Sequence, residues 1–173
     1  YYKLQNFIFM PAYGLNNASI PIIAYNYGAG NKDRIRSAVK YGLIFVSVIM
    51  AAGIFLLQVF PDPIVGTFAL TKESSLLCVT ALRIITCGFF FAGFNIILQG
   101  ICQALGNGIY SLIISMIRML IVVLPMAWIL SKLPYAQTSV WFSIPFAELS
   151  ACVLAAILTK SLFRKRLKII SKS

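Results

Sequence analysis

Histidine is absent from this 173-residue chain, and acidic residues are scarce, with 4 Asp and Glu against 15 Lys and Arg. The absence of histidine excludes Ser-His-Asp and Cys-His catalysis and removes a common zinc ligand. A membrane-embedded active site needs two or more polar catalytic groups that meet inside the bilayer. One intramembrane Glu without any His does not supply them, so we expect no enzyme.

Cysteine is present but follows no pattern that binds metal. The four cysteines lie inside apolar runs and share no metal-ligand spacing; they are Cys78, Cys87, Cys102 and Cys152. Free cysteines in such runs behave as small buried hydrophobic residues. We therefore expect no disulfide framework, no metal site and no resident cofactor.

Charged residues make up 11% of the chain and hydrophobic residues 60%, whereas an ordinary soluble domain has about 25% charged residues. A soluble domain of this size cannot bury so much apolar surface. The composition predicts a polytopic membrane protein. The net charge of +11 does not indicate a nucleic-acid partner, because the basic residues collect between long apolar runs.

The apolar runs predict an all-α membrane bundle of about five spans, since a span needs about 20 mostly apolar residues. The expected spans cover residues 5–28, 37–60, 75–104, 108–131 and 138–162. Turn-forming Gly, Pro, Asn and Ser separate them. Glycines and prolines inside the spans are compatible with bent helices around a cavity, although both residues are common in membrane helices in any case.

Lysine and arginine counts predict the orientation of the spans, because cytoplasmic connections are rich in both. The first connection and residues 163–173 carry most of them and lie on the same side of a five-span bundle. We therefore expect residues 163–173 to form a basic cytoplasmic tail in contact with anionic membrane lipids. The contributing residues are Lys32, Arg34, Arg36, Lys40, Lys160, Arg164, Lys165, Arg166, Lys168 and Lys172.

Glu148 is the acid that falls inside an expected span, at roughly 15 Å from the outer end of its helix. An ionised carboxylate at that depth must face a cavity, find a partner or take up a proton. Arg118 lies at a similar depth in the preceding antiparallel span, so the two side chains are expected to be able to pair. Glu148 is then either a protonation or cation-coupling group or one half of a structural ion pair.

Polar side chains also recur in the third span. Asn95, Gln99 and Gln103 are spaced four residues apart, which places them on one face of a helix. Such a face points into protein or water rather than lipid. Asn95 and Gln99 are candidates for a solute pathway, with interhelical hydrogen bonding as the alternative. Asn17 and Tyr25 give the first span a weaker polar side.

The segment from Gly14 to Ala29 contains the run Pro-x-x-x-Tyr-Asn-Tyr-Gly-Ala and is followed by Arg34 and Arg36. It resembles the second helix of the C-terminal lobe in multidrug and toxic-compound extrusion (MATE) transporters. Further matches follow in the same order along almost the whole chain. They are Leu82-Arg83-Ile84, Gln103-Ala104-Leu105-Gly106-Asn107, Ser115-Met116-Ile117-Arg118, Pro125, Val140-Trp141, Pro145 and Glu148.

The resemblance implies the last five of twelve spans, so the chain is expected to be a piece of a longer protein whose N-terminal lobe is its partner. It implies antiport at the plasma membrane, in which Na⁺ or H⁺ enters and an amphipathic, often cationic, compound leaves by alternating access. One branch of the family has a carboxylate where this chain has Asn95. Asn95 cannot ionise, so that route to a cation site is not available in this lobe.

A second interpretation is a lipid-linked glycan flippase of the same superfamily. Such a protein needs a basic central cavity that lipids can reach. Arg118 and Arg83 are the residues that this chain offers for it.

Overall fold

The computed structural model describes residues 2–68, 71–133 and 135–170, and these residues form helices and short turns without a β-strand. The elements in chain order are α1 (Tyr2–Gly28), α2 (Lys32–Val59), α3 (Pro61–Gly66), α4 (Lys72–Thr86), α5 (Phe89–Ala104), α6 (Gly108–Met116), the π-helical η1 (Ile117–Val123), α7 (Leu124–Leu130), α8 (Ala136–Ser139), the 3₁₀-helical η2 (Val140–Phe142) and α9 (Ser143–Ile170).

The helices confirm the predicted all-α membrane bundle. Four helical stretches are long and apolar enough to cross a membrane: Tyr2–Gly28, Lys32–Val59, Gly108–Leu130 and Ala136–Arg166. The bent pair α4 and α5 brings the number to 5 when it is counted as one span. The last helix continues to Ile170, so the part of the expected basic tail that the structure describes prolongs the fifth span as a helix.

The third span is not one continuous helix, as the predicted range 75–104 implied, because α4 and α5 meet at an angle of 53°. The bend leaves the carbonyl of Arg83 without its regular helical donor, and the amide Nε2 of Gln58 in α2 donates to that oxygen at 3.0 Å. Nε2 also donates to Oγ1 of Thr86 at 2.6 Å. In lipid a broken helix is stable only when neighbouring groups satisfy the freed backbone, and Gln58 does so here.

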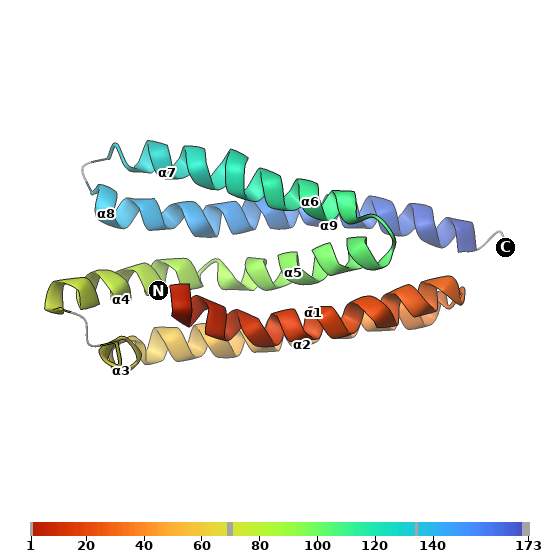
Figure 1. The fold of residues 1–173 in the computed structure, drawn as a ribbon, viewed down its shortest axis with the longest axis horizontal. Coiled ribbons are helices and arrows are strands. Elements are labelled where there is room, and N and C mark those ends of the chain that lie inside the picture. The colour runs from red at the N-terminus through yellow and green to blue at the C-terminus, as the bar shows by residue number, and fades with distance from the viewer. Residues whose placement is uncertain (1, 69–70, 134, 171–173) are drawn as a thin grey trace.

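Helix α5 lies at the centre of the bundle and packs against α1, α2, α6 and α9. Figure 1 shows α1 and α2 on one side of it and the α6–α7 stretch with α9 on the other. The buried side chains of α5 are mostly apolar, among them Phe89, Ile97 and Ile101, and they form one hydrophobic cluster with residues of α1, α2 and α4. Among the buried residues of α5, Asn95 is the one with a polar side chain.

The connections divide between the two ends of the bundle (Figure 1). The α1–α2 and α5–α6 connections lie at the same end as the C-terminal part of α9. The α3 helix and the α7–α8 connection lie at the opposite end. The basic residues of the first connection and of the last helix are thus gathered at one end of the molecule.

Gly88 permits close packing at the bend. A Cβ at this position would lie 2.8 Å from the Cα of Pro145 in α9. Because this is a backbone atom, the contact could be relieved only by a shift of the helix itself. We expect Gly88→Ala to lower the free energy of unfolding by about 1–3 kcal/mol through overpacking. Thermal unfolding of the full-length protein in detergent measures the effect. Gly108→Ala is the matched control, because nothing lies within 4 Å of its Cβ position; equal stability of the two variants would contradict the prediction.

Candidate functional site: a polar cleft with a buried ion pair

Arg118 and Glu148 form an ion pair between η1 and α9. Nη1 of Arg118 lies 3.0 Å from Oε1 and 3.1 Å from Oε2 of Glu148. Both residues are 12 positions from the ends of the α7–α8 connection, Leu130 and Ala136, which is about 18 Å along each helix. The side chains are 23% and 11% exposed. The pairing that the sequence allowed is therefore present, far from either end of the bundle.

Asn95 joins the ion pair to the central helix. Its Nδ2 donates to Oε2 of Glu148 at 2.8 Å and to the backbone oxygen of Glu148 at 3.0 Å. Asn95 is fully buried, and its Oδ1 has no partner among the described residues. A side-chain amide is suited to this place because it donates to a carboxylate without adding a charge. Three elements, α5, η1 and α9, thus meet at one carboxylate.

Arg118 lies in a widened helical turn. The amide of Leu124 donates to the oxygen of Met119, five residues earlier, as in a π-helix. The next residue is Pro125, which has no amide hydrogen and whose ring clashes with a carbonyl four residues back in a regular helix. Single π-helical turns accommodate such interruptions and change the direction of the side chains that precede them. The interruption at Pro125 thereby affects where Arg118 points.

Gln99 and Gln103 connect α5 to α6 through serines. Oε1 of Gln99 accepts hydrogen bonds from Ser111 at 3.2 Å and from Ser115 at 2.9 Å. Nε2 of Gln103 donates to Oγ of Ser111 at 2.9 Å. This is the interhelical bonding that was the alternative to a pathway role. Both glutamines also line a cavity, and the pathway role of Gln99 stays a prediction.

Two adjoining cavities form a polar cleft between α1 and η1, and both are lined by Phe9, Tyr13 and Arg118. The first has a volume of about 160 Å³ and is also lined by Asn16, Ala92, Ile96, Gln99 and Gln103. The second, of about 320 Å³, is also lined by Tyr2, Gln5, Asn6, Met119, Val123, Ile144 and Glu148. Amides, aromatic rings and the ion pair therefore share one cleft.

The two α1 residues proposed for a pathway lie outside the cleft. Asn17 is exposed and Tyr25 is 75% exposed, and neither lines the cleft. The structure does not bring them to the ion pair, and their role in a pathway stays a prediction. The α1 residues that line the cleft are Tyr2, Gln5, Asn6, Phe9, Tyr13 and Asn16. Apart from Gln5, they are spaced alternately four and three residues apart, which is the signal of one helical face that could have identified them.

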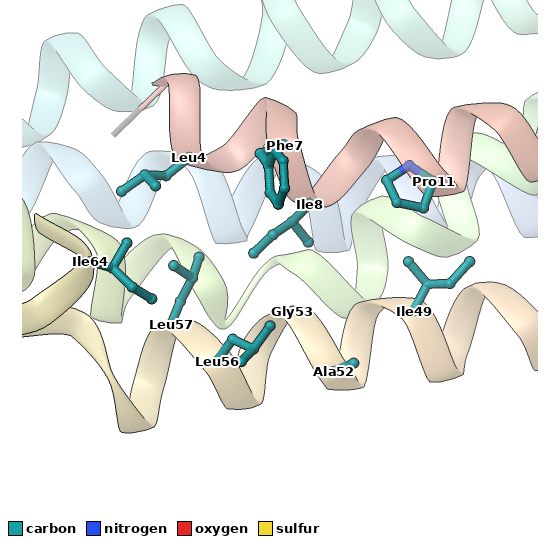
Figure 2. Close-up of a pocket in the computed structure, with 10 residues that line it drawn as sticks. All are labelled: Leu4, Phe7, Ile8, Pro11, Ile49, Ala52, Gly53, Leu56, Leu57 and Ile64. Atoms are coloured by element: carbon teal, nitrogen blue, oxygen red, sulfur yellow. The ribbon is translucent and has the colours of Figure 1, made fainter. Parts of the chain in front are cut away.

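A second hollow lies between α1 and α2 and has a different character (Figure 2). It has a volume of about 430 Å³ and is lined by apolar side chains and glycine: Leu4, Phe7, Ile8, Pro11, Ile49, Ala52, Gly53, Leu56, Leu57 and Ile64. Figure 2 shows Ile8 of α1 above Leu57 and Gly53 of α2. This groove offers no hydrogen-bonding or charged side chain, so polar recognition belongs to the cleft.

The cleft offers hydrogen-bonding groups and a paired charge to a polar molecule. No group of three or more His, Cys, Asp and Glu side chains comes together in the part of the chain that the structure describes. The carboxylate that lines the cleft is neutralised by the arginine that lines it. A bundle of membrane-length helices around such a polar cleft defines a multi-pass membrane protein with a cleft suited to solutes.

Comparison with known proteins gives the family. The MatE family model matches residues 2–129, and the chain belongs to this family of membrane transporters. Multidrug export protein MepA of Staphylococcus aureus (strain bovine RF122 / ET3-1) is 27% identical over 168 residues, which are 97% of this chain and 36% of MepA. The chain therefore spans about a third of the length of the curated relatives that it matches.

Solved structures agree with the fold. The crystal structure of a MATE protein in the bent conformation superposes with a TM-score of 0.91 at 19% identity, over 98% of this chain and 38% of that one. The MATE multidrug transporter DinF-BH has a TM-score of 0.82 at 30% identity, over 90% of this chain and 34% of that one. The five-span bundle is thus a substructure of larger MATE proteins.

Asn95 offers a direct test of the hydrogen bonds at the centre of the site. We expect Asn95→Ala to lower the free energy of unfolding by about 1–3 kcal/mol, because Glu148 loses a buried donor. The exposed Asn17→Ala is the matched control and should change stability by no more than about 0.5 kcal/mol. Chemical unfolding of both variants measures the difference. Two equal effects would show that the bonds to Glu148 do not contribute.

Proposed function

We propose that this chain is most of the C-terminal lobe of a cation-coupled MATE antiporter that exports amphipathic organic compounds, often cationic, by alternating access. The observation that carries the proposal is the polar cleft, which places an ion pair, amides and aromatic rings within apolar, membrane-length helices. Polar groups at that depth are costly and are typical of solute and ion pathways. MepA, a multidrug export protein, matches 97% of this chain, which supports the same class of activity.

The other parts of the proposal follow from the length of the relatives and the distribution of charge. The matched region is 36% of MepA, so nearly two thirds of that relative lies outside it, and we propose that an N-terminal lobe completes the transporter. Na⁺ or H⁺ is the proposed coupling ion. The proposed pathway residues are Asn95, Gln99, Arg118 and Glu148, together with Asn17 and Tyr25 on α1.

The flippase alternative requires a basic cavity. Arg118 lines the cleft, but its charge is balanced by Glu148 at 3.0 Å. Arg83 is exposed on α4 and lines neither cavity of the cleft. The geometry of this half therefore favours an exporter over a flippase that binds a glycan phosphate.

Efflux of a fluorescent organic cation by the full-length transporter tests the function. Ethidium is a suitable probe because it is aromatic and its positive charge does not change with pH. In proteoliposomes loaded with this dye, we expect efflux when a Na⁺ or a proton gradient is imposed, and no efflux without a gradient. Each gradient is imposed separately, so the effective one names the coupling ion. A folded, inserted protein that moves no dye under either gradient would contradict the antiporter and favour the flippase.

The proposed orientation has its own test. Asn31 and Asn107 lie in connections at the basic end of the bundle, and Thr71 lies at the other end. We expect the thiols of Asn31→Cys and Asn107→Cys to react with an impermeant reagent only from the cytoplasmic side, because basic ends stay inside. The thiol of Thr71→Cys should react only from outside. Mass shifts on inside-out and right-side-out vesicles report the difference, and the reverse pattern would invert the proposed orientation.

A further inference from the structure

We propose that Arg118 acts as a built-in cation that permanently occupies the carboxylate of Glu148, so that the coupling cation is not exchanged at Glu148. This inference rests on the proposed function and deepens it. It makes Arg118 a specificity-determining residue, because it decides whether this half of the pathway carries an exchangeable cation. The coupling cation then binds at residues other than Glu148.

The contacts of the carboxylate support this assignment. Nη1 of Arg118 lies within 3.1 Å of both carboxylate oxygens, and Nδ2 of Asn95 occupies Oε2 from the other side. These contacts use most of the acceptor sites of the carboxylate, and the guanidinium already supplies the positive charge that a further cation would bring. Arginine does not lose its proton in proteins, so the partner remains a cation under all physiological conditions.

Among the described residues, the groups around Glu148 include no second positive charge. The titratable groups near Glu148 are Arg118 of η1, Tyr13 and Tyr2 of α1, and Cys152 of its own helix α9, while α5 contributes the neutral Asn95. Arg118 is the one member of this set that is positively charged. If Glu148 took up a proton or Na⁺, the largely buried guanidinium would be left without its anion, which is unfavourable.

The same reasoning predicts a cation site when Arg118 is removed. In Arg118→Met, Glu148 keeps its buried position and the donor from Asn95 but has no cation. A largely buried carboxylate without a counter-charge recruits a proton or another cation. The variant should therefore acquire a dependence on pH or on Na⁺ that the natural protein lacks at this position.

The experiment measures the thermal unfolding midpoint of the full-length protein in detergent, which needs no transport. The four forms are the natural protein, Glu148→Gln, Arg118→Met and the double variant. Each is measured at acidic and alkaline pH, with NaCl or with choline chloride at equal concentration. Glu148→Gln should respond to pH and Na⁺ as the natural protein does, because any response comes from residues elsewhere. Arg118→Met should gain a stabilisation of about 3 °C or more by acid or Na⁺, and the double variant should lose that gain.

Two results would overturn the inference. One is loss of a pH or Na⁺ response of the natural protein in Glu148→Gln, which would show that Glu148 already exchanges a cation. The other is an Arg118→Met variant whose response equals that of the double variant. If Arg118→Met does not fold, the comparison of the pH and Na⁺ responses of Glu148→Gln with those of the natural protein is sufficient to test the inference. Arg118→Lys keeps a cation at this position and should respond to pH and Na⁺ as the natural protein does. Failure of dye efflux in the natural protein would refute the proposed function without changing these readings.

Discussion

The structure depends on one electrostatic constraint: a largely buried charge must have its counter-charge in contact. Arg118 and Glu148 satisfy this requirement for each other at 3.0 Å, and Asn95 adds a donor from the central helix. Removing one member of a buried pair typically costs about 3–5 kcal/mol, because it leaves the other uncompensated. The pair therefore fixes the position of η1 relative to α9, and α5 is attached to both through the same carboxylate.

The same requirement applies to the backbone where the helices are irregular. At the bend between α4 and α5, Gln58 supplies the donor that the Arg83 carbonyl lost. Before Pro125, the chain adopts a π-helical turn in which Leu124 donates to Met119 instead. Both irregularities lie on elements that form or support the cleft. Each is stable because a specific donor replaces the regular helical bond.

The sequence predicted features that extend over many residues better than features that depend on a single residue. Spans of twenty apolar residues are strong signals, and the pairing of Glu148 with Arg118 followed from equal depth in antiparallel helices. Glycines in the third span allowed a bend, but its position at Gly88 could not be chosen among them, because glycine is common in membrane helices and the close approach to Pro145 is a tertiary contact. On α1, Asn16 lines the cleft whereas Asn17 does not. One residue turns a helix by about 100°, so the choice between neighbours needs the packing of the whole bundle.

Because the cleft is neutral, it limits which steps of transport these five spans can perform. Long-range attraction of a cation requires net negative charge, and this cleft has a balanced pair in place of a free acid. What remains for recognition in this half is contact with the rings of Phe9 and Tyr13 and hydrogen bonding to amides such as Gln99. Those groups discriminate by shape and polarity rather than by charge. Under the proposed function, selection for cationic substrates and coupling to an ion gradient therefore depend on carboxylates outside these five spans, while this half supplies an apolar and hydrogen-bonding wall.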